Sequence, residues 1–313
     1  MKFSFVFPGQ GSQSVGMLAA FVAAHEDHPA VRDTLAEASD VLHQDIAALV
    51  AEGPLERLAL TTNTQPVMLA ADVAVFRAWR AAGGNAPFVV AGHSLGEYAA
   101  LVAAGVLEFS AALPLVRLRA EAMQEAVPVG TGAMAAILGL EDDAVRACCS
   151  ESAQHEVVEA VNFNAPMQVV IAGHRGAVER ACEAAKARGA KRALILPVSA
   201  PFHSSLMKPA ADRLAGHLAD VVFSTPQMDV INNIDVAMPQ AAASMRDALV
   251  RQASGPVRWA ETIRKMAAEG VTHVVECGPG KVLAGLTRRV DGSLVSAAIV
   301  DPASLAQTRE LLQ

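Results

Sequence analysis

The chain has 313 residues, of which 52 % are hydrophobic and 18 % charged, with a formal net charge of −7 at pH 7. This length and composition allow one or two α/β units with a sizeable core and exclude a disordered or low-complexity protein. The acidic balance argues against nucleic acid or an anionic membrane as the main partner.

The sequence also predicts the compartment and the absence of a metal centre. No apolar run approaches the roughly 20 residues of a membrane-spanning helix, and Pro8 interrupts the apolar start too early for a secretory signal. We therefore expect a cytoplasmic protein that does not bind membranes. Four cysteines lack a Cys-x-x-C spacing, so neither a disulfide framework nor a zinc site is expected.

The chain begins with an apolar segment, residues 3–7, and continues with the glycine-rich segment 8–13. We predict a buried strand followed by a loop. The glycines do not match the G-x-G-x-x-G fingerprint, and no Gly-Lys-Ser/Thr follows, which disfavours a phosphate loop. The loop could instead present a backbone N–H to a catalytic site as an oxyanion donor.

Residues 29–80 are predicted to be helical, with a break at Gly53-Pro54. A polar segment, 61–66, precedes a helix that we expect to start near Val67. Gln65 lies in this segment. It could line a pocket or serve only at the helix entry, and the sequence leaves both interpretations open.

Residues 88–105 carry the most informative motif. Their order predicts a strand, a tight turn and a helix that ends at Gly105, with G-x-S-x-G at 92–96. This is the context of a nucleophile elbow, in which the glycines allow a sharp turn and Ser94 is exposed at a helix N-terminus. The N–H of Leu95, the residue after the nucleophile, would then be an oxyanion donor. An idle serine in a glycine-rich turn is the alternative, and the flanking strand and helix disfavour it.

The next predicted helix places a cation on its apolar face. At about 100° per residue, Leu115, Leu118 and Ala122 form one apolar stripe, and Arg119 lies within it. A buried arginine needs an anion because it cannot lose its proton. That anion could belong to a structural salt bridge or to a substrate carboxylate, and a snorkelling side chain is a third possibility.

Residues 127–198 are predicted to form a small inserted domain. Strands and helices follow in the order β-α-β-β-α-β, which is typical of the ferredoxin-like fold. The flanking segments, 1–126 and 199–313, predict a large α/β domain with a mostly parallel sheet between helices.

The segment Ala200-Pro201-Phe202-His203-Ser204 follows this insert directly. A histidine in a loop at a domain junction is a credible general base. His93 is adjacent to Ser94, but neighbouring residues leaving a strand point apart. No acidic residue between Ser94 and His203 stands at a strand end, so we expect the histidine to be oriented by another group, such as a main-chain carbonyl.

Four cations cluster at the end of the insert, namely Lys186, Arg188, Lys191 and Arg192. They could be a solvated helix end that complements the helix dipole, or they could capture an acidic partner.

Taken together, these motifs resemble one family over essentially the whole chain, the malonyl-CoA:acyl carrier protein transacylases of type II fatty-acid synthesis. The matching segments, in family order, are residues 9–13, 92–98, 119–124, 162–164, 200–204 and 276–280. The one departure is Cys277 in Glu-Cys-Gly-Pro-Gly, where the family has an aliphatic residue, and nothing catalytic depends on it.

The resemblance implies an α/β-hydrolase-like large domain and roles for individual residues. Ser94 would be the nucleophile and His203 the general base and acid, while the backbone N–H groups of Gln10 and Leu95 would form the oxyanion hole. Arg119 would hold the malonyl carboxylate.

Three further residues receive roles from the resemblance. The main-chain carbonyl of Gln252 would orient His203, and Asn162 would be a neighbour of the pocket. Phe202 occupies the place where related acyltransferase domains that take malonyl have phenylalanine.

The implied reaction is a ping-pong transfer of malonyl from malonyl-CoA to the phosphopantetheine thiol of acyl carrier protein, with no metal or redox cofactor. The carrier of this family is strongly acidic, so the four clustered cations become a candidate docking surface. A hydrolase and a binding module with a vestigial elbow are the rival interpretations.

Overall fold

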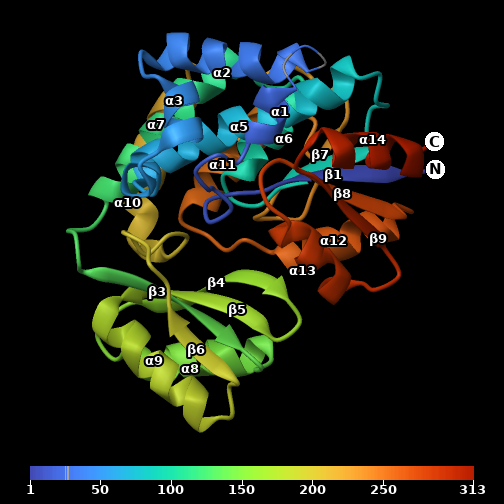
Figure 1. Cartoon of the computed structure of the whole chain (residues 1–313). Helices are drawn as coiled ribbons and strands as arrows, with labels where there is room; N and C mark the ends of the chain where they lie inside the picture. The colour runs from blue at the N-terminus through green and yellow to red at the C-terminus, as the bar shows by residue number, and fades with distance from the viewer. Residues whose placement is uncertain (25, 27) are drawn as a thin grey trace.

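The computed structural model describes residues 1–24, 26 and 28–313, and it contains two β-sheets in separate units (Figure 1). In the larger sheet every neighbouring pair of strands is parallel, in the order β7-β2-β1-β8-β9. Its strands are β1 (Phe3–Phe7), β2 (Val89–Gly92), β7 (Asp229–Ile231), β8 (His273–Cys277) and β9 (Val295–Ile299). The predicted mostly parallel sheet is confirmed.

Helices cover both faces of this sheet, which explains why every residue of β1 is buried. Side chains alternate between faces, so Phe5 packs into the core beneath α5 whereas Val6 packs against α12 and α13. The helices of this unit are α1 (Ala19–Ala23), α2 (Pro29–Leu42), α3 (Ile46–Glu52), α4 (Leu55–Leu58), α5 (Thr61–Ala81), α6 (Gly96–Ala103), α7 (Phe109–Glu125), α10 (Lys208–Leu218), α11 (Ala242–Ala253), α12 (Trp259–Ala268), α13 (Val282–Val290) and α14 (Pro302–Leu311), with a short 3₁₀ turn, η1 (Ser205–Met207). No helix among the described residues is both long enough and apolar enough to span a membrane.

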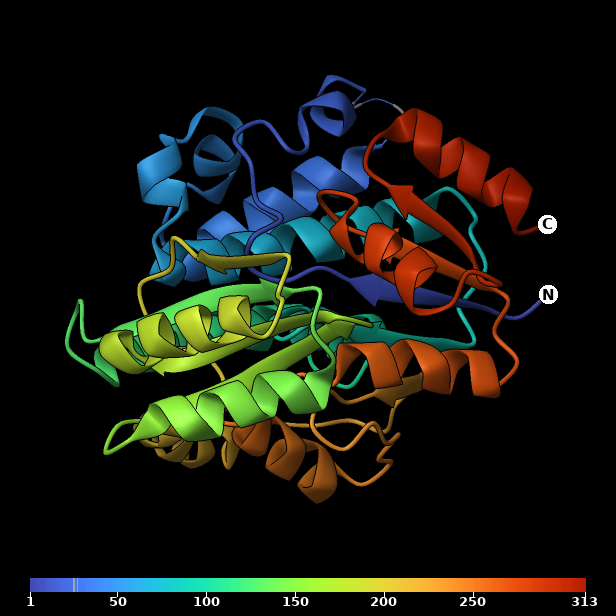
Figure 2. The same ribbon diagram turned by 90° about the horizontal axis from the view of Figure 1, so that it is seen from below.

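The smaller sheet is antiparallel, with the strand order β4-β5-β3-β6. Its elements follow one another as β3 (Gly132–Leu138), α8 (Asp142–Ala153), β4 (Val158–Ala165), β5 (Gln168–His174), α9 (Arg175–Ala187) and β6 (Arg192–Ile195). Figure 2 shows α8 and α9 lying over one face of this sheet. That face and the two helices share a hydrophobic core separate from the core of the large unit.

The two units meet along β4. Val257, just after α11, pairs with Asn162 as an isolated bridge, with Val257 N–H donating to Val161 O and Phe163 N–H donating to Val257 O. This contact joins β4 of the small sheet to the loop between α11 and α12 of the large unit.

One predicted boundary is wrong. The helix expected to start near Val67 begins at Thr61 and contains Pro66. The first four N–H groups of a helix have no partner within it, so a proline at the sixth position removes only one further hydrogen bond. Gln65 is therefore a helical residue and not part of a loop.

Candidate active site

Ser94 stands at a sharp turn between β2 and α6. Its φ is +54°, a left-handed conformation that is unusual for serine and is held by surrounding contacts. Ser94 N–H donates to Asn233 Oδ1 at 2.7 Å, and Asn233 Nδ2 donates to Gly92 O at 2.8 Å. A Cβ at Gly96 would lie 2.1 Å from Phe7 O, so the turn can pass β1 only with glycine there.

The structure brings Ser94, His203 and Gln252 into one chain of hydrogen bonds. Ser94 Oγ lies 2.6 Å from His203 Nε2, and His203 Nδ1 lies 2.9 Å from the main-chain oxygen of Gln252. A carbonyl accepts only, so Nδ1 carries the proton and Nε2 is free to accept from the serine hydroxyl. A main-chain carbonyl thus occupies the place that a carboxylate fills in many hydrolases.

Burial keeps His203 neutral. It lowers the pKa of His203 to about 3, and the nearby Arg119 cation lowers it further in the same direction. The imidazole is therefore unprotonated at neutral pH and able to accept a proton.

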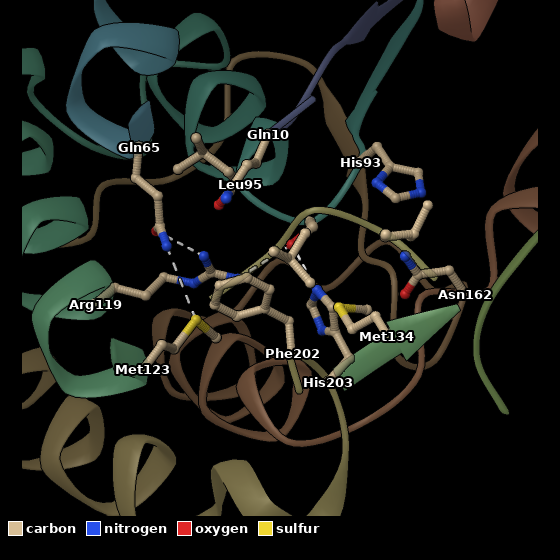
Figure 3. A pocket seen from close by; sticks show the side chains of 13 residues that line it. Gln10, Gln65, His93, Leu95, Arg119, Met123, Met134, Asn162, Phe202 and His203 are labelled. Atoms are coloured by element: carbon tan, nitrogen blue, oxygen red, sulfur yellow. Dashed lines mark hydrogen bonds between the residues drawn. The ribbon is translucent and has the colours of Figure 1, made fainter. Parts of the chain in front are cut away.

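Arg119 is 3 % exposed, and its side chain extends from α7 into the cavity (Figure 3). Its Nη2 lies 3.2 Å from Ser94 Oγ and 3.1 Å from Gln252 Oε1, while Nη1 donates to Gln65 Oε1 at 2.7 Å. Its Nε has no partner among the described residues. No carboxylate of the described residues lies within 4.0 Å of the Arg119 guanidinium. The alternative that Arg119 forms a structural salt bridge is therefore not supported among these residues.

Gln65 lines the cavity, which resolves the question that the sequence left open. Besides accepting from Arg119, its Nε2 lies 3.9 Å from Met123 Sδ (Figure 3). Its neutral amide oxygen therefore holds the guanidinium in place from the side of α5.

Gln10 and Leu95 both line the cavity (Figure 3). Neither backbone N–H donates to any other group among the described residues. The loop that carries Gln10 packs tightly on the elbow, because a Cβ at Gly9 would lie 2.4 Å from His93 O. Thr61 Oγ1 donates to Gln10 Oε1 at 2.8 Å and fixes the side chain.

The cavity has a volume of about 120 Å³ and lies where the two units meet. The large unit supplies Phe202 to its wall, and the small sheet supplies Met134 and Asn162, whose Oδ1 is buried without a partner among the described residues. The full lining is Gln10, Gln65, His93, Ser94, Leu95, Arg119, Met123, Met134, Asn162, Leu196, Val198, Phe202 and His203.

His93 points away from the serine hydroxyl. Its Nε2 is 2.8 Å from Asn164 Oδ1, and its ring lies tilted against that of Trp259, with the ring centroids 5.3 Å apart. It links the elbow to the small sheet, and burial lowers its pKa.

The four clustered cations divide into two pairs. Lys186 bonds to Glu183 at 2.8 Å and Arg188 to Glu151 at 2.6 Å, so their charges are already matched. Lys191 and Arg192 form no ion pair within the described chain. They line a hollow with Arg289 of α13, which donates to Gln168.

Sequence reasoning missed Glu97 and Asn233. Glu97 Oε2 accepts from Asn233 N–H at 2.9 Å and from Gln252 Nε2 at 3.0 Å. An acidic residue in the first turn of a helix is ordinary, so Glu97 gave no separate signal. Only its position three residues after the nucleophile could have drawn attention to it.

Comparison with known proteins shows one family. Residues 4–305 match the family described as "Acyl transferase domain". The chain is 54 % identical over 310 residues to the malonyl CoA-acyl carrier protein transacylase of Escherichia coli K12, covering 99 % of both chains.

Two solved structures are similar over nearly the whole chain. The acyl-carrier-protein S-malonyltransferase of Burkholderia pseudomallei 1710b is 65 % identical, with a TM-score of 0.97 and 99 % of this chain and 100 % of that chain covered. A malonyl-transacylase in complex with a type II PKS acyl-carrier protein is 54 % identical, with the same TM-score and coverage.

Proposed function

This chain belongs to the malonyl CoA-acyl carrier protein transacylases of the acyl transferase family, and we propose that it performs their reaction at Ser94. It is an acyltransferase that moves the malonyl group of malonyl-CoA to acyl carrier protein for fatty-acid biosynthesis. A cytoplasmic location stays a prediction.

The main support for the proposed roles is that the buried Arg119 cation lies beside the hydrogen-bonded pair of Ser94 and His203. Arg119 Nη2 is 3.2 Å from Ser94 Oγ, and amides and a hydroxyl are its described hydrogen-bond partners. A substrate that ends in a carboxylate would bring an anion to this cation and could accept hydrogen bonds from two of the three guanidinium nitrogens. A neutral ester gains nothing from such a cation.

In the first half-reaction Ser94 Oγ attacks the thioester carbonyl while His203 Nε2 takes the hydroxyl proton. The N–H groups of Gln10 and Leu95 hold the oxyanion. When the intermediate collapses, the C–S bond breaks and His203 passes the proton to sulfur. CoA leaves as the thiol, and malonyl remains as the Ser94 ester.

In the second half-reaction the phosphopantetheine thiol of the carrier gives its proton to His203 and attacks the ester carbonyl. The bond between carbon and the serine oxygen breaks, and His203 returns the proton to Ser94. The two thiols occupy the site in turn, which is a ping-pong course.

Mass spectrometry of the intact protein with malonyl-CoA tests this proposal. We expect one malonyl adduct, which peptide mapping assigns to Ser94, and further CoA release only when carrier protein is added. Continued CoA release without the carrier would favour a hydrolase. The absence of any adduct would favour a binding module.

We also propose that residues 127–198 are a ferredoxin-like domain inserted in an α/β-hydrolase-like domain of residues 1–126 and 199–313. The order β3-α8-β4-β5-α9-β6, the strand order β4-β5-β3-β6 and the separate core support this division.

For the carrier we propose a docking surface in the basic cluster, led by Lys191 and Arg192. Both are exposed and lack ion pairs within the described chain, whereas the charges of Lys186 and Arg188 are matched. The hollow that they line also contains Pro166, two residues beyond the Asn164 that contacts His93. The surface therefore adjoins the end of the small sheet that faces the elbow.

A further inference from the structure

Glu97 is buried next to the reactive groups, yet the mechanism above gives it no role. It is 2 % exposed in the first turn of α6, and it makes no ion pair within the described residues. Its described hydrogen bonds end on one oxygen, Oε2, which accepts from Asn233 N–H and from Gln252 Nε2.

Gln252 connects Glu97 to the reacting groups through hydrogen bonds of its side chain. Its Nε2 donates to Glu97 Oε2 at 3.0 Å and to Ser94 O at 2.9 Å, and its Oε1 accepts from Arg119 Nη2 at 3.1 Å. An amide has one donor end and one acceptor end, so two acceptors on one side fix the oxygen toward the guanidinium. The main-chain oxygen of Gln252 holds His203.

We propose that Glu97 is a positioning residue that holds Arg119 and His203 in line with Ser94 through Gln252, and that it takes up a proton when an acyl carboxylate binds Arg119. Its protonation thereby couples pH to the choice between malonyl and neutral acyl groups. The inference rests on the proposed function, since it takes Arg119 as the ligand of the malonyl carboxylate.

The charges around Glu97 explain the proton uptake. Arg119 on α7 is the cation that faces it, and Asp235, in the loop after β7, is an anion. Tyr98, on the same helix, is a neutral phenol because burial raises its pKa to about 12, and His203 is neutral. A malonyl carboxylate would place a second buried anion beside Arg119, which favours the protonated form of Glu97.

The Glu97 carboxyl can gain or lose a proton near neutral pH. Burial raises the pKa of Glu97 to about 7, although Gln252, Asn233 and Arg119 oppose this rise. The protonated acid keeps a carbonyl oxygen that can accept both hydrogen bonds, so the charge changes while the alignment persists. The proton comes from bulk water as malonyl binds and returns to it when malonyl leaves.

The preference for malonyl over acetyl should fall as the pH rises above 7. Below pH 7 Glu97 already holds its proton, and malonyl binds without further cost. Above pH 7 each malonyl group must bring one proton, so acylation by malonyl-CoA relative to acetyl-CoA falls toward about tenfold per pH unit. His203, whose pKa is near 3, does not titrate in this range.

Two matched substitutions test the inference. Glu97→Gln keeps an oxygen for both hydrogen bonds and removes the charge. Glu276→Gln alters another buried glutamate, on β8, whose pKa burial also raises to about 7. Rates of Ser94 acylation by malonyl-CoA and acetyl-CoA are measured from pH 6 to 9. We expect the ratio of rates to fall with pH in the wild type and in Glu276→Gln, and to stay constant in Glu97→Gln.

The measurements distinguish the proton uptake, the positioning role of Glu97 and the proposed function. A constant ratio in the wild type, or a slope that persists in Glu97→Gln, would overturn the proton uptake. Glu97→Ala should slow acylation by both substrates about tenfold or more, with rescue by glutamine, and an unchanged rate would overturn the positioning role. If Ser94 accepts no malonyl at any pH, the proposed function itself fails.

Discussion

Gln252 makes four of the hydrogen bonds that organise the site, one through its main chain and three through its side chain. Neither the main-chain hydrogen bond nor the side-chain hydrogen bonds can be predicted from the fact that the residue is a glutamine. A backbone carbonyl carries no sequence signature, so the lack of a suitable acidic residue could suggest a main-chain carbonyl as the partner of His203, but the choice of Gln252 came only from the family resemblance. The side-chain contacts join residues more than 130 positions apart and depend wholly on the fold.

Ser94, Arg119 and His203 could be proposed as candidate site residues from the sequence for a different reason. Each stands in a local pattern with a physical meaning: a glycine-flanked turn, an apolar helical stripe and a loop at a domain junction. Glu97 and Asn233 were missed because their neighbours along the chain say nothing about their partners.

We expect Ser94→Ala to abolish both the malonyl adduct and carrier malonylation, because the described elbow supplies no second hydroxyl near His203. Intact-mass measurement after incubation with malonyl-CoA checks this, with circular dichroism to verify folding. A malonyl adduct on another residue of the variant would contradict the assignment of the nucleophile.

Arg119→Ala should lose malonyl transfer far more than acetyl transfer. A charged hydrogen-bonded pair contributes about 1.5–3 kcal/mol, or roughly 10- to 150-fold, and acetyl has no carboxylate to lose. The measurement is kcat/KM for the two CoA esters. Arg117→Ala, on the same helix but half-buried and bonded to Gln44, is the matched control. Equal losses for both esters would make Arg119 structural.

Two buried acidic residues face each other between α5 and β8, namely Asp72 and Glu276, and sequence patterns did not reveal this pair. Asp72 of α5 is fully buried with both carboxyl oxygens unpartnered among the described residues. Burial, and then the charge of Glu276, raise its pKa well above the ordinary value. The apolar run of α5 predicted a helix in the core, but the pattern could not say that its one acid would face another.

This acid should lower stability at neutral pH. Because its pKa is raised on folding, the folded chain holds a proton that the unfolded chain releases, and the penalty grows as pH rises above the ordinary value near 4. We expect Asp72→Asn to raise Tm at pH 7, by roughly 1.5 °C for each kcal/mol gained in a chain of 313 residues, with a smaller gain at pH 5. Calorimetry checks this.

The exposed Asp33→Asn serves as the control and should change Tm little at either pH. A gain in Asp72→Asn that did not increase with pH would contradict the titration and point to packing instead.

The molecule as a whole carries a net charge of −7, but Lys191 and Arg192 lie together at its surface without an ion pair among the described residues. These two cations are therefore the first candidates for contact with an acidic carrier. We expect Lys191→Glu with Arg192→Glu to lower kcat/KM for the carrier about tenfold or more at low ionic strength. The difference from the wild type should shrink as salt is added, because charge steering acts mainly on encounter.

The control for this prediction is Lys186→Glu, whose cation is already paired with Glu183. Acylation by malonyl-CoA alone should stay near the wild-type rate in all these variants, since that half-reaction never meets the carrier. A loss in both half-reactions would indicate a folding defect or a role in binding CoA.

The linear order of the chain delays the site during synthesis. Ser94 and Gln252 are 158 residues apart, so at about 5–20 residues per second the ribosome makes the second some 8 to 30 seconds after the first. Until then the hydrogen bond from His203 to the main-chain oxygen of Gln252 cannot form, so under the proposed mechanism we expect a growing chain not to react with malonyl-CoA. A ribosome that stalls in this interval leaves β1 open along the edge that β8 would cover, where another chain can pair with it.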